Sequence, residues 1–385
     1  MDHFFSFTGA KKIVFGNGCF NSLPTQIAEM RAVNPLILVD GALAKLGMEA
    51  KVADLFKGSS MKCNIFADIS PEPTVEIVDK IATIAKKAKS DIVIGIGGGS
   101  AMDVAKAVAV LATNNGKATD YVGLNKVPKA GLPTIMVPTT AGTGSEVTFT
   151  AVFIRKDIGK KQGINSPFLY PSLALLDPCL TVSVPPMVSA TTGIDALCHA
   201  IESYTSIIAS PMSELVSAEA IMLIGDNLRD CVHNGGNIEA RSNMLLGSLY
   251  AGLGLANAGV TAVHSLSYPL GGRYGVPHGL ANTLLLPAVM EYNIPSSLNK
   301  FANIAELLGE NIDGLSLRDA ADLAVDAVMC LIADCGINVT LKDVGVKKTD
   351  LAKLAKEAME VARPLANNPR AITAKDMIEI YNIAF

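Results

Sequence analysis

The chain has 385 residues, which is too long for one ordinary domain and suits two. Half of the residues are hydrophobic and only 18% are charged, so we expect apolar surface to be buried between subunits of a homodimer or larger homo-oligomer. The net charge of −4 and the pI near 5.8 provide no basic face for a phosphate backbone, which argues against nucleic-acid binding.

Short apolar segments alternate with helical patterns through the first half of the chain. Six of these segments are typical of strands: Lys12–Phe15, Leu36–Asp40, Cys63–Phe66, Asp91–Ile96, Thr134–Val137 and Leu173–Leu176. Helical spacing lies between them, notably over Thr74–Ala88 and Ser100–Ala112. This alternation predicts a Rossmann-like α/β domain whose parallel sheet is covered by helices on both faces.

The pattern changes at Thr181–Pro186, a segment with a Pro-Pro step. Beyond it, helical spacing dominates and strand-like alternation is nearly absent. The expected helices include Met187–Tyr204, Met212–Cys231, Ile238–Ala256, Thr261–Leu270 and Gly279–Tyr292. We therefore predict an α/β domain over residues 1–184 and an all-helical domain over residues 185–385.

A run of glycines follows the strand that ends at Ile96. Gly97, Gly98 and Gly99 allow backbone amides to approach a diphosphate closely, and Ser100 opens a helix whose dipole favours negative charge. Ser100 and Asp103 fit a Ser-x-x-acid capping pattern at this helix start. The alternative is a tight strand-to-helix turn that binds nothing, and the glycine run alone does not decide between the two.

Two further segments follow strands in the same domain. Asp40 ends a strand, where a carboxylate can bind both ribose hydroxyls and favours NAD over NADP, although such an acid is often only a turn residue. The loop after the predicted strand Thr134–Val137, residues 138–146, is rich in small and hydroxyl residues that can line a cofactor. It contains Thr139, Thr140 and Thr143.

Histidine is scarce, and four of the five histidines fall in the helical half. Asp195 and His199 are four residues apart and share one helix face, and His264 and His278 flank a Gly/Pro-rich turn. One carboxylate and three imidazoles suit Fe(II) or Zn(II). The alternative is a solvated polar stripe formed by Asp195, His199 and Glu202. His3 and His233 are expected to be ordinary surface residues.

Together these segments resemble the iron-containing, or group III, alcohol dehydrogenase family. The matching stretches cover essentially the whole chain: IGGGSAMDVAKA, MVPTTAGTGSEVT, DPCLTVSVPP, ATTGIDALCHAIESY and HSLSYPLGGRYGVPHGLANTLLLP. The greatest likeness is to lactaldehyde/propanediol oxidoreductases and 1,3-propanediol dehydrogenases. The resemblance implies a dinucleotide-binding domain and a metal-binding, catalytic domain with a cleft between them, as in dehydroquinate synthase-like folds.

The resemblance also assigns roles to individual residues. It implies that the metal ligands are Asp195, His199, His264 and His278. It implies cofactor contacts at Asp40, Gly97, Gly98, Gly99, Ser100, Thr139, Thr140 and Thr143, and with a looser alignment at Val152, Lys161 and Leu180. Many relatives carry a further histidine four residues after the third ligand, where this chain has Tyr268. Tyr268 either relays the proton in its place or only lines the pocket.

The expected function is therefore hydride transfer between NAD(H), preferred over NADP(H), and a small primary alcohol or diol and its aldehyde. One divalent metal is expected, Fe(II) first and Zn(II) second. The rival is a metal-dependent lyase that retains NAD, as dehydroquinate synthase does. The seven scattered cysteines predict reduced, mostly buried thiols in a cytoplasmic protein, and neither a signal peptide nor a membrane span is expected.

Overall fold

The computed structural model describes residues 4–385 and divides them into two compact units. The α/β unit comprises Gly9–Thr140 and Ser145–Thr181. The helical unit comprises Val182–Phe385 together with the short segment Ala141–Gly144 and the described residues before Gly9. The polypeptide therefore enters the helical unit briefly in the middle of the α/β unit.

The α/β unit is built on a parallel sheet. In the described part of the chain this sheet has six strands in the order β1-β9-β6-β4-β2-β3. Their bounds are Ile13–Phe15 for β1, Pro35–Asp40 for β2, Asn64–Ile69 for β3, Ile92–Gly97 for β4, Thr134–Pro138 for β6 and Leu173–Leu176 for β9. The six strands expected from the sequence are thus confirmed, as is the parallel pairing.

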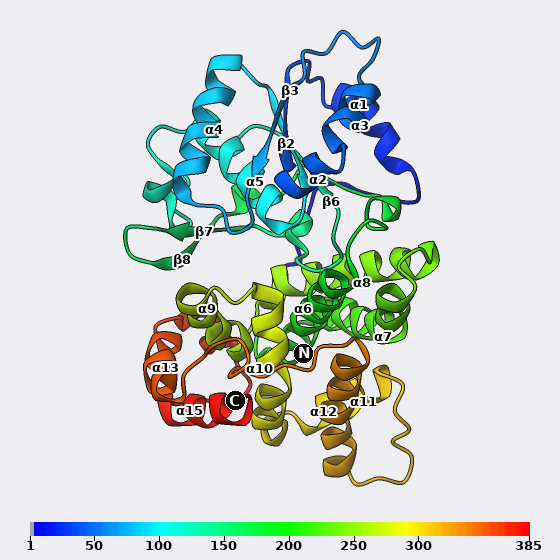
Figure 1. Ribbon diagram of the computed structural model, residues 1–385, viewed down its shortest axis with the longest axis vertical. Helices are drawn as coiled ribbons and strands as arrows, with labels where there is room; N and C mark the ends of the chain where they lie inside the picture. The colour runs from blue at the N-terminus through cyan, green and yellow to red at the C-terminus, as the bar shows by residue number, and fades with distance from the viewer. Residues whose placement is uncertain (1–3) are drawn as a thin grey trace. The chain divides into compact units, whose positions relative to one another are not determined.

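Both faces of this sheet are buried. Along β2, Leu36 and Leu38 point into one hydrophobic core, and Ile37 and Val39 point into another, because successive side chains of a strand alternate. Helices α4 and α5 cover the first face and α1 and α3 the second (Figure 1). The helices of this unit are α1 Leu23–Glu29, α2 Gly41–Lys45, α3 Met48–Leu55, α4 Val75–Ala88 and α5 Gly99–Thr113.

A second, small sheet was not expected from the sequence. Its strand order is β5-β8-β7, with β5 at Gly123–Leu124, β7 at Thr150–Arg155 and β8 at Lys160–Asn165. The sequence of β8 is KKQGIN, which has no alternation of apolar and polar residues. Its pairing with β7, and not its own pattern, makes this segment a strand.

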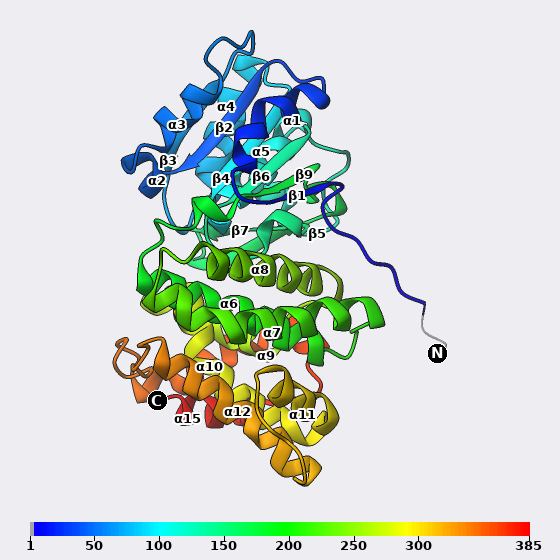
Figure 2. The same ribbon diagram turned by 90° about the vertical axis from the view of Figure 1, so that its right-hand side faces the viewer.

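The helical unit contains α6 to α15. The five helices expected from the sequence are confirmed as α6 Pro186–Thr205, α7 Pro211–His233, α8 Ile238–Ala258, α9 Ala262–Tyr274 and α10 His278–Asn293. They are followed by α11 Leu298–Leu307, α12 Leu317–Asp334, α13 Leu351–Met359, α14 Ala362–Asn367 and α15 Ala374–Ile383. Helices α6, α7 and α8 pack side by side (Figure 2) around a core that includes Ile194, Leu228 and Met244.

Two expectations from composition are tested by this fold. The seven cysteines are free thiols, but only Cys198, Cys231 and Cys335 are buried, so the expectation of mostly buried thiols is wrong.

No single helix within residues 4–385 combines the length and the apolar character needed to cross a membrane. Helices α8 and α9 meet that test only as a pair, and the pair is bent by 103°.

Candidate metal centre and phosphate-binding turn

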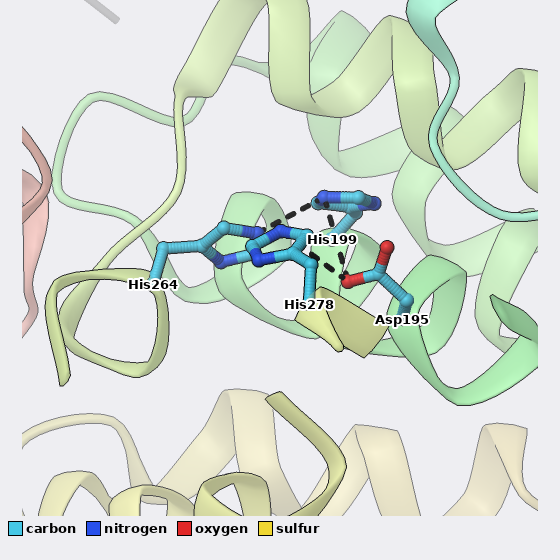
Figure 3. Close-up of side chains that lie close together, drawn as sticks. All are labelled: Asp195, His199, His264 and His278. Carbon is cyan, nitrogen blue, oxygen red and sulfur yellow. Dashed lines mark hydrogen bonds and ion pairs between the residues drawn. The ribbon is translucent and has the colours of Figure 1, made fainter. Parts of the chain in front are cut away.

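The four residues singled out as metal ligands come together within the helical unit (Figure 3). Asp195 and His199 lie one turn apart on α6, His264 lies in the first turn of α9, and His278 is the first residue of α10. One ligand atom from each residue lies within 4.8 Å of those of the other three. Segments separated by more than 60 residues in the sequence thus contribute to one cluster.

Three of the four residues of the cluster are buried. Asp195 is 2% exposed, His199 5% and His264 3%, whereas the side chain of His278 is 31% exposed. The alternative of a solvated stripe on α6 is therefore wrong, because Glu202 is also 2% exposed. The neighbouring apolar helix faces bury Asp195, His199, Glu202 and His264. Solvent reaches the cluster at the side chain of His278.

Hydrogen-bond partners determine the tautomers of two imidazoles. Nδ1 of His199 lies 3.3 Å from the carbonyl oxygen of Gly142, and Nδ1 of His264 faces the Glu202 carboxylate. Both partners only accept hydrogen bonds, so Nδ1 carries the proton in each ring. The two Nε2 atoms then face each other, 3.0 Å apart, with their lone pairs. This contact is repulsive unless a cation or an additional proton lies between the rings.

The geometry fits a divalent cation. Asp195 Oδ1 lies 4.0 Å from His199 Nε2 and 3.9 Å from His278 Nε2, and the His199–His264 separation is 3.0 Å. Tetrahedral coordination with bonds of about 2.0–2.1 Å places ligand atoms roughly 3.3 Å apart, which lies within this spread. Three imidazole nitrogens and one carboxylate oxygen form a donor set that suits Fe(II) or Zn(II).

The electrostatics of the cluster support binding of a cation. Burial disfavours the ionised form of Asp195, but the three surrounding imidazoles and the amide of Asn282 outweigh this penalty and lower the pKa of its carboxyl below the ordinary value. Burial lowers the pKa of His199, and the attraction of Asp195 compensates only in part. Asp195 therefore remains an anion and His199 a neutral imidazole, which are the forms that bind metals.

Asn282 was not singled out from the sequence. It lies one turn after His278 on α10, is fully buried, and donates through Nδ2 to Asp195 Oδ1 at 2.6 Å. Its Oδ1 has no hydrogen-bond partner among the described residues. The only sequence signal was its position four residues after His278, which placed it on the same helix face.

A glycine allows α10 to approach α6 at the cluster. A Cβ added to Gly279 would lie 2.6 Å from the carbonyl oxygen of Thr191 and 3.5 Å from Cβ of Asp195. Any side chain there would push α10 away from α6, and with it the neighbouring His278. The glycine after this histidine is therefore a requirement of the site's packing.

The remaining side chains around the cluster are also placed. The Tyr268 ring lies on α9, with its centroid 6.4 Å from that of His264 and 6.0 Å from that of His278. His233 lies on the surface at the end of α7, as expected, with Nε2 2.8 Å from the carbonyl oxygen of Asp334. His3 lies outside the described residues.

Several of the residues expected at a cofactor gather at one edge of the α/β unit. Asp40 ends β2 and caps α2 by accepting from the amide of Ala42 at 2.8 Å, while Gly97 ends the neighbouring strand β4. The two strand ends touch, since a Cβ on Gly97, whose φ is +150°, would lie 2.8 Å from Cβ of Asp40. The amide of Thr139, after β6, donates to the Gly97 carbonyl at 3.1 Å.

The strand order gives this edge a special position. The chain passes from β2 to its outer neighbour β3 and from β4 toward β6, so the order reverses between β2 and β4. Ligands of open parallel sheets bind outside the carboxyl ends of the strands at such a reversal. Asp40 and the turn from Gly97 to Ser100 lie there.

The expected capping pair at the start of α5 is wrong. The helix begins at Gly99, and Gly98 is its N-cap without any side-chain cap. The carboxylate of Asp103 instead accepts from Ser145 Oγ at 2.6 Å, from the amide of Val152 at 2.8 Å and from Lys106 Nζ at 3.1 Å. Asp103 thus binds the segment after β6 to α5, and the first-turn amides of α5 keep no side-chain acceptor.

A buried lysine and a buried glutamate complete this network. Lys106 is 1% exposed, and burial lowers its pKa although the Asp103 carboxylate acts in the opposite direction. Its Nζ also donates to the carbonyl oxygen of Ser145 at 3.0 Å. Burial raises the pKa of Glu146 to about 7. The hydrogen bonds of Ser145 with Asp103 and Lys106 hold the end of the loop that the sequence suggested as a cofactor-lining segment.

The other expected cofactor residues are more dispersed. Ser100 lies in the first turn of α5, and Thr140 ends the part of the α/β unit that precedes Ala141, whereas Thr143 belongs to the helical unit. Val152 lies on β7 and Lys161 on β8, where it forms an ion pair with Glu72. Leu180 lies in the hydrophobic core, 4% exposed.

Comparisons with known proteins agree with this arrangement. The family model for "Iron-containing alcohol dehydrogenase" matches residues 10–178, and that for "Fe-containing alcohol dehydrogenase family, C-terminal" matches residues 189–385. The chain is 40% identical to long-chain-alcohol dehydrogenase 1 of Geobacillus thermodenitrificans (strain NG80-2) over 373 residues, which is 96% of this chain and 94% of that relative.

Two solved structures show the same fold. The crystal structure of a 1,3-propanediol oxidoreductase superposes with a TM-score of 0.97 at 35% identity and covers 100% of both chains. That of sulfoacetaldehyde reductase from Bifidobacterium kashiwanohense, in complex with NAD⁺, superposes with a TM-score of 0.89 at 31% identity and covers 99% of both chains. The family matches, the fold and the four-residue cluster agree: the chain belongs to the iron-containing alcohol dehydrogenase family and is an oxidoreductase of alcohols and aldehydes.

Proposed function

We propose that this enzyme uses one divalent metal and NAD(H) to interconvert a small primary alcohol or diol and its aldehyde. The observation that carries the proposal is the pair of Nε2 atoms of His199 and His264, 3.0 Å apart beside the Asp195 carboxylate. A cation bound among them would stabilise two lone pairs and an anion that share one buried cluster.

Asp195, His199, His264 and His278 are the proposed ligands, with Fe(II) as the first candidate and Zn(II) as the second. Such an ion supplies Lewis acidity, which polarises a substrate oxygen and favours loss of hydride from an alcohol or its addition to an aldehyde. Three of the proposed ligands are buried and shielded from water, and the partly exposed side chain of His278 is where we expect substrate to arrive.

The cofactor is proposed to bind the α/β unit at the reversal of strand order. The amides of Gly98, Gly99 and Ser100, together with the α5 dipole, are suited to the pyrophosphate, since that helix start has no competing side-chain cap. The Asp40 carboxylate is suited to the ribose hydroxyls and opposes a 2′-phosphate. Thr139, Thr140, Thr143, Val152, Lys161 and Leu180 are the further contacts proposed. The NAD⁺ complex of the related sulfoacetaldehyde reductase supports a nicotinamide cofactor.

Tyr268 is proposed as a proton-relay group. Its ring lies beside those of His264 and His278, and Tyr268 shares a face of α9 with His264, four residues earlier. The alternative is that Tyr268 only lines the pocket and transfers no proton. The pH profile of turnover by Tyr268→Phe distinguishes the two roles.

We further propose a cytoplasmic homodimer or larger homo-oligomer, which the free thiols and exposed apolar residues such as Ile207 and Leu215 support.

The reaction is tested on protein stripped of metal and reloaded with Fe(II) or Zn(II). Formation of NADH and NADPH is followed by absorbance with a panel of small primary alcohols and diols. We expect no turnover without metal, restoration by one of the two ions, and a faster reaction with NAD⁺ than with NADP⁺. Tight binding of metal and NAD⁺ without turnover of any alcohol or aldehyde would instead support the NAD-retaining lyase.

Cofactor preference is tested by Asp40→Asn. The amide oxygen still caps α2 at the Ala42 amide, but the negative charge is lost. Removing this charge from the neighbourhood of a 2′-phosphate should raise kcat/KM for NADP⁺ about tenfold relative to that for NAD⁺. Steady-state kinetics with both cofactors measure the change. An unchanged ratio would show that Asp40 does not face the ribose.

A further inference from the structure

We propose that Glu202 is a positioning residue for the metal centre: its carboxylate fixes both the backbone and the ring of His264. This inference rests on the proposed function, because it assigns a role toward the metal that the four ligands would bind. Glu202 lies on α6 one turn after His199, and its side chain is 2% exposed.

The two oxygens of this carboxylate have different partners. Oε1 accepts from the amide of Thr261 at 2.9 Å, from the hydroxyl of Thr261 at 2.7 Å and from the amide of Val263 at 2.9 Å. Oε2 accepts from Nδ1 of His264 and from the thiol of Cys198 at 3.6 Å. Four of these five donors belong to Thr261, Val263 and His264, which are the residue before α9 and two residues of the first turn of α9. The carboxylate therefore holds the start of α9 against α6.

The contacts of Oε1 fix the start of α9. The first-turn amides of a helix have no partner within the helix. Thr261 is the N-cap of α9, but its own side chain makes no capping hydrogen bond. Glu202 supplies the missing acceptor from another helix, and a negative charge is stabilising at that position. His264 is the third residue of α9, so its Cα is fixed by the same contacts.

The contact of Oε2 fixes the ring. A carboxylate only accepts hydrogen bonds, so it holds the proton of His264 on Nδ1 and leaves the lone pair on Nε2, the atom that faces His199. His199 has only the neutral carbonyl of Gly142 at the equivalent position. Of these two imidazoles, His264 is therefore the more strongly oriented one.

The test is Glu202→Gln, which keeps the size of the side chain. A glutamine has one accepting oxygen and one NH₂ group, so in either orientation N–H groups oppose the donors of Thr261 and Val263 or the N–H of His264. We expect a Zn²⁺ affinity about 10- to 100-fold weaker than in the wild type, the range measured for such supporting partners. Competition with a chelator of known affinity measures it.

Two variants separate this role from general destabilisation. Glu219→Gln makes the same chemical change on an exposed residue of α7, and its Zn²⁺ affinity should equal that of the wild type. Thr261→Val removes one hydroxyl contact to Oε1 but leaves the contact to the His264 ring. It should lower the thermal stability while keeping the Zn²⁺ affinity within about twofold.

A spectroscopic measurement needs no variant at the site. The measurement is the two-bond ¹H–¹⁵N NMR correlation spectrum of ¹⁵N-histidine-labelled wild type loaded with Zn²⁺. The pattern of the His264 ring should show the proton on Nδ1. A proton on Nε2, or an affinity of Glu202→Gln equal to the wild type, would overturn the inference. A wild type that binds no Zn²⁺ or Fe²⁺ would instead refute the proposed function, and the His264 tautomer of the metal-free protein at alkaline pH would still decide the role of Glu202.

Discussion

Replacing His278 by alanine should abolish most metal binding and most turnover while the protein remains folded. His278 begins α10, and its side chain is 31% exposed, so its removal leaves little buried cavity. Asp195, His199 and His264 would keep their places but lose the fourth donor. A Lewis acid contributes several kcal/mol to such a reaction, so we expect kcat/KM to fall on the order of 1,000-fold.

Metal content by elemental analysis and steady-state kinetics at saturating Fe(II) or Zn(II) measure this effect, and circular dichroism measures the fold. His233→Ala is the matched control, since His233 is exposed at the end of α7 and pairs only with a carbonyl oxygen of Asp334 among the described hydrogen bonds. It should retain full metal content and activity. A His278→Ala protein with a full complement of metal and normal turnover would refute the assignment of His278 as a ligand.

Replacing Asp103 by alanine should strongly destabilise the α/β unit. Asp103 accepts three hydrogen bonds, and one of them comes from the buried ammonium group of Lys106 at 3.1 Å. Without the carboxylate, a buried cation loses its counter-charge and the amide of Val152 loses its acceptor. Breaking a buried ion pair on one side costs about 3–5 kcal/mol, which corresponds to a midpoint roughly 10 °C lower.

The matched control for this prediction is Asp54→Ala. Asp54 also pairs with a lysine three residues later, Lys57, but both side chains are exposed, at 63% and 77%. Exposed pairs of this kind add little, so its midpoint should equal that of the wild type. Thermal unfolding of the two variants measures the difference. Equal midpoints for both would mean that Lys106 releases its proton or finds another anion without loss of stability.

The parallel sheet and the main helices could be read from the sequence because their signals are local. Strands β2 and β4 are continuous apolar runs, as expected for strands buried on both faces. Helices α4, before β4, and α5, after it, show helical spacing. The grouping of Asp195 with His199 was equally local, because residues four apart share a helix face.

The tertiary structure decided the features that depend on partners far along the chain. Glu202 fits a solvated stripe when α6 is considered alone, but it is buried by Thr261 and its neighbours, 59 residues away. Asp103 fits a helix cap when its own helix is considered, but its carboxylate pairs with Val152, 49 residues away. The strand β8 likewise depends on β7.

One physical reason separates the features that the sequence predicts from those that only the tertiary structure decides. Periodicity and local geometry determine which face of an element is apolar, and this information is contained within a few residues of sequence. The burial of a polar group, its ionisation and its hydrogen-bond partners depend on which elements pack together, because the desolvation of a charge is tolerated only where other segments bring the compensating donors. The sequence alone therefore determined the strands of the main sheet, most of the helices and the candidate metal-binding residues. Only the packing of α6, α9 and α10 brought Asp195, His199, His264 and His278 into one cluster.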